Sequence, residues 1–272
     1  MMKATIKRAW LLILTLWAGI GFAQTQDTLT AKKQVPDSFE IHKVLIVPFN
    51  PMMYISDSDQ ELMKKSGLTF PKLVERFRSG LGVALTQKMP GWWQYELLNE
   101  QQDSTQETTR IYRCISYQYE PMDEKTMGAK KELLKKNEPK EQPKITKGQL
   151  SIEPDKGPKF MNIRFKSDTL LPFLQNKYKV DFVLFINQLD IQSDLSDYAA
   201  NANKTYKRFA HVHYTMLDKE GKTHFAGLAK AAFPCTENDL QTIINTAFME
   251  ASGIVTGHLP PPVPVKKAKS AK

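Results

Sequence analysis

The chain has 272 residues, of which 41% are hydrophobic and 25% charged, and its formal net charge is +9. A charge of this size suggests a nucleic-acid or anionic membrane partner, but three of the excess positive charges lie in residues 1–23 and four in residues 260–272. The chain between these two segments is nearly neutral, whereas nucleic-acid-binding proteins concentrate basic residues on a folded face. We therefore expect no nucleic-acid partner.

The N-terminus has the three parts of a secretory signal peptide. Lys3, Lys7 and Arg8 form a basic start, an apolar run follows over residues 10–20, and small residues lead up to Ala23. We predict a signal peptide with cleavage after Ala23 and an exported protein, periplasmic or secreted, of the Gram-negative type. The apolar run is too short for a good membrane span, although an uncleaved anchor is the alternative. No cysteine lies near the cleavage point to carry a lipid anchor.

Three elements are predicted in the first hundred residues, after a flexible leader at residues 24–40. Residues 42–49, "HKVLIVPF", are apolar on both faces and predict a strand that is covered on both sides. Residues 70–89 predict a helix with apolar residues at three- and four-residue spacing and with Thr69 as its cap. Residues 92–99, "WWQYELLN", predict a second strand.

The middle of the chain is less regular. Residues 104–121 fit no single period, and the spacing of Ile111, Ile115 and Tyr119 favours a helix. Residues 123–159 are rich in Lys, Glu, Gln and Pro and contain few large apolar residues. Such a composition cannot bury enough surface to offset the entropy lost on ordering. We predict a flexible insertion within one domain, not a linker between two domains.

The second half of the chain alternates strands and helices. We predict a short strand at residues 160–165, a helix at 168–178 and the strongest strand at 180–191. A hairpin at residues 209–233 and a long amphipathic helix at 236–259 follow. The hairpin turns at residues 218–221, and Thr236 with Asp239 resembles a capping box at the start of the last helix.

These elements together predict an α/β fold. We expect a single domain over residues 41–259, with a mixed sheet, packed helices and a long C-terminal amphipathic helix. The Pro- and Lys-rich tail at residues 260–272 is expected to be disordered.

This order of elements resembles a periplasmic α/β domain. Residues 45–49 read as apolar residues followed by Pro-Phe, and Asp181-Phe182-Val183 opens a central strand just after a helix. Both motifs are similar to those of the TolB N-terminal domain, the curli-secretion channel family and the outer-membrane activators of penicillin-binding proteins. The resemblance covers residues 42–99 and 168–258 and extends to uncharacterised exported proteins of Gram-negative bacteria.

The resemblance implies an envelope protein that binds other envelope components and catalyses no reaction. The chain departs from the lipid-anchored members in two ways, because it has no lipobox cysteine and it carries the Lys-rich insertion.

Two acidic loops are candidate metal sites. Asp57 and Asp59 follow the first strand, and Asp194 and Asp197 follow the central strand. If these strands are parallel, both loops emerge at one edge of the sheet, where ligands of open α/β sheets bind. Four carboxylates there could hold a hard cation. Such residues are also ordinary in turns and helix caps, which is the interpretation that we favour.

Three histidines of the predicted hairpin form a second candidate metal site. His211 and His213 share one face of a strand, and the turn of the hairpin places His224 on the same face. Three imidazoles within reach of one another can bind zinc or copper, but a change of one residue in register removes His224. The apolar residues between them look like the core side, so that the histidines face solvent or a covering helix: Val212, Tyr214 and Met216. We predict no metal and no cofactor.

No catalytic motif is recognisable. The sequence has no G-x-S-x-G elbow, no H-E-x-x-H and no glycine-rich phosphate loop, so we predict that the protein is not an enzyme. Cys114 and Cys235 are the only cysteines. In an oxidising compartment they can form a disulfide, and two lone buried thiols are the alternative.

Two groups of residues are candidates for binding a partner protein. The first is Met52, Met53 and Tyr54, which mix adaptable apolar and polar side chains in loop 50–60, next to loop 193–206. The second is Trp92 and Trp93, because adjacent strand residues face opposite ways and one indole can remain exposed. Packing of both indoles under the helix at residues 70–89 is the interpretation that we favour over an exposed indole.

We predict an exported, non-catalytic adaptor or assembly protein of the cell envelope that binds another envelope protein. The alternatives are a periplasmic protein that binds a metal, a small ligand or a glycan, and, after these, a hydrolase.

Overall fold

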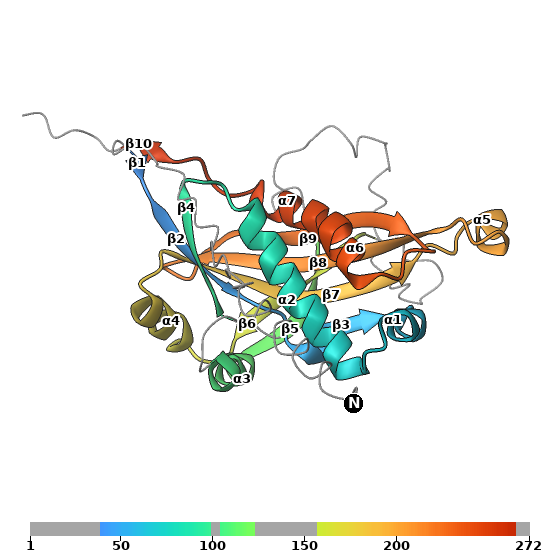
Figure 1. The fold of residues 1–272 in the computed structure, drawn as a ribbon. Coiled ribbons are helices and arrows are strands. Elements are labelled where there is room, and N and C mark those ends of the chain that lie inside the picture. Colours follow the sequence, from blue (N-terminus) through green and yellow to red (C-terminus); the bar gives the residue numbers. More distant parts are fainter. Residues whose placement is uncertain (1–38, 99–103, 123–156, 265–272) are drawn as a thin grey trace, which may run out of the picture. The chain divides into compact units, whose positions relative to one another are not determined.

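A mixed β-sheet with helices on both faces forms the protein in the computed structural model (Figure 1). The structure describes residues 39–98, 104–122 and 157–264, all of which belong to one compact unit. The predicted signal peptide at residues 1–23, nearly all of the leader, most of the insertion and residues 265–272 lie outside the described residues.

All of the predicted strands except the one at residues 160–165 form one continuous sheet with β7 (Phe182–Ser193) in its middle. The strand order is β4 (Trp93–Leu97), β2 (His42–Val47), β7, β8 (Lys207–Asp218) and β9 (Thr223–Pro234). β2 is parallel to both β4 and β7, whereas β8 and β9 are antiparallel. Beyond the end of β2, the short strand β3 (Tyr54–Ser56) pairs with β7 in parallel. The expected α/β class, with a mixed sheet, is confirmed.

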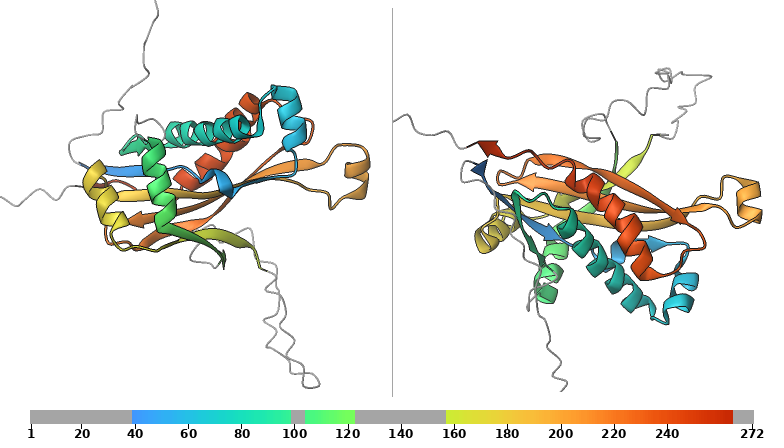
Figure 2. Two further views of the ribbon diagram at one scale, coloured as in Figure 1. Left: turned by 90° about the horizontal axis from the view of Figure 1, so that it is seen from below. Right: turned by 45° about the horizontal axis from the view of Figure 1, so that its top comes forward.

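One face of the sheet is covered by α1 (Asp59–Ser66), α2 (Phe70–Lys88) and the C-terminal helix (Figures 1 and 2). Val44 and Ile46 of β2 point into this layer, which is the larger hydrophobic core. The rings of Phe77 on α2 and Phe248 on the C-terminal helix lie 5.2 Å apart. The apolar spacing in residues 70–89 therefore predicted the buried face of α2 correctly.

The C-terminal helix runs over residues 240–256 and is shorter than the expected 236–259. It consists of α6 (Leu240–Ile243), a π-helical stretch η3 (Ile244–Phe248) and α7 (Met249–Thr256). The predicted capping box of Thr236 and Asp239 is wrong: Asp239 itself is the N-cap, and its Oδ1 accepts the backbone N–H of Thr242 at 2.8 Å. The helix therefore begins at Leu240, after the capping carboxylate.

The other face of the sheet carries α3 (Ser104–Cys114) and α4 (Leu170–Tyr178) over a second, smaller core. Leu45 and Val47 of β2 point to this side, so β2 is buried on both faces as its composition indicates. The helix favoured for residues 104–121 was only half correct. It ends at Cys114, and β5 (Ile115–Pro121) follows without a connecting loop.

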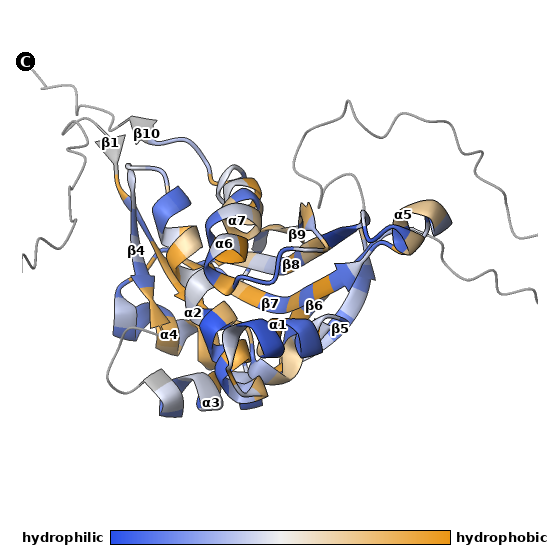
Figure 3. Ribbon diagram, turned by 45° about the vertical axis from the view of Figure 1, so that its right-hand side comes forward, coloured by the Kyte–Doolittle hydropathy of each residue, from blue (hydrophilic) through white to orange (hydrophobic). Residues whose placement is uncertain are grey.

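β5 pairs with β6 (Lys159–Phe165) in a separate antiparallel ribbon that lies on the same side as α3. Pro121 lies opposite Lys159, and the N–H of Met122 donates to the carbonyl of Pro158 at 2.8 Å. The two ends of the predicted insertion therefore meet. Along β7, hydrophobic and hydrophilic stretches alternate, and β5 is mostly hydrophilic (Figure 3).

The remaining elements are small. β1 (Phe39–Glu40) pairs with β10 (Val263–Pro264), and the 3-10 turn η1 (Pro51–Met53) follows β2. The helix α5 (Tyr198–Ala202) lies at the tip of the arm that joins β7 to β8 (Figure 1). Among the described residues, no helix combines the length and the apolar character needed to cross a membrane.

Candidate functional site

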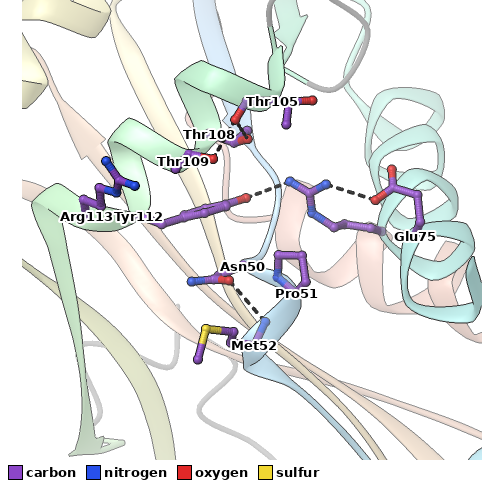
Figure 4. Close-up of a pocket in the computed structure, with 10 residues that line it drawn as sticks. Asn50, Pro51, Met52, Glu75, Thr105, Thr108, Thr109, Tyr112 and Arg113 are labelled. Atoms are coloured by element: carbon purple, nitrogen blue, oxygen red, sulfur yellow. Dashed lines mark hydrogen bonds and ion pairs between the residues drawn. The ribbon is translucent and has the colours of Figure 1, made fainter. Parts of the chain in front are cut away.

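The parallel strands β2 and β4 lead to helices on opposite faces of the sheet. The chain after β2 reaches α2 on one face, and the chain after β4 reaches α3 on the other. In open α/β sheets, this arrangement leaves a crevice at the carboxyl ends of the two strands, and ligands bind there. A cavity of about 620 Å³ occupies this position, between Asn50–Met52, α2 and α3 (Figure 4).

Arg78 forms the wall of the cavity that α2 contributes. Its guanidinium donates through Nε to the carbonyl of Phe49 at 2.7 Å, through one terminal nitrogen to Glu75 at 3.2 Å and through the other to the hydroxyl of Tyr112 at 2.8 Å. Arg78 is only 9% exposed. It therefore links the segment after β2, α2 and α3 at the point where the two faces of the sheet meet.

The opposite wall is one stripe of α3. Its members follow the three- and four-residue spacing of a single helix face: Thr105, Thr108, Thr109, Tyr112 and Arg113. Burial raises the pKa of Tyr112, although the neighbouring Arg78 opposes this rise. The phenol therefore stays protonated, and it donates to the carbonyl of Pro48 at 2.9 Å while accepting from Arg78.

The three residues proposed in loop 50–60 lie in different environments. Met52 is 87% exposed and lines the cavity, whereas Met53 is half-buried. Tyr54 is buried, packs against the rings of Phe70 and Phe77, and donates to Asp59 at 2.6 Å. Tyr54 is therefore a core residue, and only Met52 of the three is fully available to a partner.

The acidic residues of the two loops serve local structure. Asp57 accepts the backbone N–H of Ser193 at 2.7 Å and so fixes loop 50–60 to the base of the arm. Desolvation alone raises the pKa of Asp57, but hydrogen bonds from Ser58 and Ser193 outweigh it and lower the pKa below its ordinary value. Asp194 accepts from Ser196 within its own turn, and Asp197 caps α5. This is the turn and cap chemistry that we favoured over a metal site.

The arm ends in exposed apolar side chains. Leu195 is 53% exposed and Tyr198 is 86% exposed. Both lie in the arm, which extends beyond the helices of the body in the views of Figures 1 and 2. Because Asp57 is bonded to Ser193, loops 50–60 and 193–206 are adjacent at their bases, as expected from the parallel strands.

His213 of β8 faces the β5–β6 ribbon, which corrects the expectation that it faces solvent or a helix, whereas His211 is half-buried and stacks on the ring of Phe209. His213 is 3% exposed, its Nδ1 accepts the N–H of Met161 at 2.8 Å, and its Nε2 lies 3.3 Å from Asp190. His224 lies at an irregularity in the register of β8 and β9 and contacts the ring of Phe182. In the described part of the chain, no three His, Cys, Asp or Glu side chains are placed to hold a metal ion.

The opposite face of β8 is the core side, as predicted. Val212, Tyr214 and Met216 are buried in the larger core.

We expect His211 to make folding sensitive to pH. Desolvation, and then the charge of Lys230, lower its pKa from 6.5 to about 4. Between these values the unfolded chain binds a proton that the folded protein does not, so stability should fall as the pH drops through this window. Because His211 is only half-buried and solvent screens its charge, the loss is about 1–2 kcal/mol. Urea unfolding at pH 7 and pH 4.5 measures it.

The matched variant for this prediction is His211→Gln, which cannot gain the proton. Its free energy of unfolding should fall less than that of the native protein between the two pH values. An identical fall in both proteins would contradict the role of His211.

Trp92 and Trp93 differ in burial, as adjacent residues that face opposite ways can. Trp93 is 5% exposed, packs against Phe182 and donates to the carbonyl of Pro260, whereas Trp92, in the turn before β4, is 38% exposed. The prediction that both indoles are packed is therefore wrong for Trp92.

Cys114 and Cys235 are free thiols, and the Sγ of Cys235 donates to the carbonyl of Lys204. Two lone thiols were the alternative to a disulfide, but only Cys235 is buried, and Cys114 is half-buried.

Sequence reasoning missed Arg78, Tyr112 and Arg113. One signal was present for Arg78, which follows Val74 by four residues and so lies at the border of the apolar stripe of α2. A charged side chain at the border of a buried helix face is held near the core by the apolar residues of that face. No comparable signal connects α2 with α3.

No protein-family model, no curated protein and no solved structure matches the chain.

Proposed function

We propose that the protein is an exported, non-catalytic adaptor of the cell envelope that binds another envelope protein. It docks through one end of the sheet, which we call the docking edge. The docking edge consists of loop 50–60, the start of α2 and the arm between β7 and β8.

The distribution of exposed apolar side chains supports this proposal. The two most exposed large hydrophobic residues of the described chain are Met52 and Tyr198, at 87% and 86%. Ile55, Phe70 and Leu195, which are 49%, 46% and 53% exposed, lie at the same end. Apolar residues that gather on one part of a surface mark sites of protein contact. The same loops carry polar residues, among them Asp57, Ser196 and Asp197, and interfaces have a polar rim.

The chemistry of the crevice also supports binding over catalysis. The groups that line it are cations, hydroxyls and an amide, together with Glu75, which is engaged by Arg78. Nucleophilic catalysis needs a nucleophile paired with a base that a third group orients. The described lining residues contain no such set. The resemblance to adaptor domains of the envelope adds an argument by analogy.

Photo-crosslinking in intact cells tests the docking edge. A photoreactive amino acid placed at position 52 and, separately, at position 198 should give an adduct with the same partner. The matched control is position 83 on α2, where the native valine is 42% exposed and lies in the second half of the helix, away from the start of α2 that belongs to the docking edge. Met52→Asp should remove the adduct formed from position 198 and leave the thermal transition unchanged, because Met52 is exposed.

An adduct that persists in Met52→Asp would contradict the docking edge. If adducts form only from position 92, the contact surface lies instead at the opposite end of the sheet. Trp92 and Tyr95 are exposed there, and β4 is an edge strand.

A further inference from the structure

We propose that the cavity between α2 and α3 is a binding site for a small polar ligand that carries a carboxylate. This inference goes beyond the adaptor function and does not depend on it, because a small ligand in the crevice requires no protein partner at the docking edge. It rests on the position of the cavity, on the donors that line it and on its charge.

The position and size of the cavity fit a ligand site. Its volume of about 620 Å³ lies within the range of about 300–1,000 Å³ that is usual for small-molecule sites. It lies at the carboxyl ends of β2 and β4, whose following helices cover opposite faces of the sheet. Ligands of open α/β sheets bind at such points.

Arg78 supplies preorganised donors. A guanidinium has five N–H groups, and Phe49, Glu75 and Tyr112 take three of those of Arg78. Two N–H groups therefore remain within the described structure. A planar guanidinium fork matches a carboxylate. Because three fixed contacts already hold this side chain, a ligand does not bear the entropy of ordering it.

Arg113 gives the cavity an excess of positive charge. Among the residues that line the cavity, Arg78 and Arg113 are cationic and Glu75 is the only anion. Glu75 is 3.2 Å from Arg78, whereas Arg113 forms no ion pair with any residue that the structure describes. The net charge of the lining favours an anionic ligand.

The other lining groups define the rest of the ligand. The hydroxyl of Thr109 donates to the carbonyl of Thr105 at 2.8 Å, so its oxygen atom can still accept a hydrogen bond. Pro51 and Met52 add an apolar surface. The ligand should therefore combine a carboxylate with hydroxyl or amide donors and a short apolar part. An acidic amino-acid unit of a peptide and an acidic sugar both have this chemistry.

Titration of the ¹⁵N-labelled protein, followed by NMR, distinguishes the two kinds of ligand, an acidic amino-acid unit and an acidic sugar. The probes are N-acetylglutamate and glucuronate, and their neutral counterparts are N-acetylglutamine and glucose. We expect saturable shifts of the backbone signals of residues 105–113 with at least one of the two acids. Binding of its neutral counterpart should be at least tenfold weaker. The acid that binds more tightly identifies the kind of ligand.

Two arginines of α3 provide a matched pair of variants. Arg113→Gln should weaken binding of the acid about tenfold, which is the effect of one lost charged hydrogen bond. Arg110→Gln makes the same charge change on the same helix, but Arg110 lies over the ring of Phe173 and does not line the cavity. It should leave binding unchanged. Both variants are exposed and should fold.

Three results would overturn the inference. They are the absence of saturable shifts with both acids, equal binding of the neutral counterparts, and equal weakening by Arg113→Gln and Arg110→Gln. The crosslinks from positions 52 and 198 are measured in a separate experiment. Failure of the ligand site therefore does not contradict the docking edge, and failure of the docking edge does not contradict the ligand site.

Discussion

Tyr54→Asp should lower the free energy of unfolding by about 3–5 kcal/mol, whereas Met52→Asp should change it by less than about 0.5 kcal/mol. The two residues are separated by one position in the chain, but Tyr54 is 8% exposed and Met52 is 87% exposed. Replacing Tyr54 removes a ring that packs against Phe70 and Phe77. It also places a carboxylate in the core, next to Asp59.

Urea unfolding of the two variants, followed by circular dichroism, measures the difference. Tyr54→Phe is the control, because it keeps the ring and removes only the hydrogen bond to Asp59; it should lose about 1 kcal/mol. Equal stability of Tyr54→Asp and Met52→Asp would show that Tyr54 is not part of the core. If Tyr54→Asp fails to bind the partner, the cause is unfolding and not the loss of a contact. Met52 is therefore the residue with which to test docking.

His213→Leu should cost about 3–5 kcal/mol, because it breaks a buried pair and leaves Asp190 with only the hydrogen bond from the side chain of Gln188. His213 and Asp190 are 3% and 4% exposed. The substitution also removes the acceptor of the Met161 N–H, and a buried N–H without a partner destabilises the fold. Hydrogen exchange at residues 159–165 should accelerate, since His213 is one of the groups that hold β6 on the sheet.

The double variant His213→Leu/Asp190→Leu separates these effects. Once both members of a buried pair are apolar, no isolated charge remains, so the double variant should be less destabilised than the sum of the two single variants. If the effects simply add, the two side chains do not interact. His213→Leu should leave exchange in α7 unchanged as long as the protein remains folded, because α7 covers the other face of the sheet.

The main elements of the fold could be predicted from apolar periodicity. β2 is apolar at every position from Val44 to Val47, and α2 keeps its apolar residues on one face, so the sequence identifies both. The passage from α3 to β5 could not be placed in this way. The helix ends at Cys114 and the strand begins at Ile115, with no glycine, proline or cap between them to mark the change.

The polar contact between the sheet and the β5–β6 ribbon was hidden by a β-bulge. The register of β7 and β8 shifts between Ile186 and Gln188, so Asn187 and Gln188 both turn away from the larger core. If side chains alternated strictly between the two faces, either Asn187 or Gln188 would point into the larger core. Asn187 then donates to the carbonyl of Met161 at 2.7 Å. A period-based reading of the strand cannot detect the extra residue.

The candidate site was predicted only in outline. Parallel strands placed the loop after β2 at the edge of the sheet, and Met52 lies there as expected. The exposure of Met52 and the burial of Tyr54 depend on η1, whose start is set by Asn50 accepting the N–H of Met52. The contact of Arg78 on α2 with Tyr112 on α3 joins two residues that are 34 positions apart in the sequence, and no local pattern encodes that contact.

The paired ends of the β5–β6 ribbon make this position suitable for a reporter fusion. Met122 and Pro158 are joined by a hydrogen bond of 2.8 Å, so any polypeptide spliced between them leaves and re-enters the fold at one place. Doubling the length of a flexible loop costs only about 0.6 kcal/mol of closure entropy. A fluorescent protein or an epitope inserted here would keep both chain termini free. It would also be attached on the face of the sheet opposite α2 and α7, and at neither proposed binding surface.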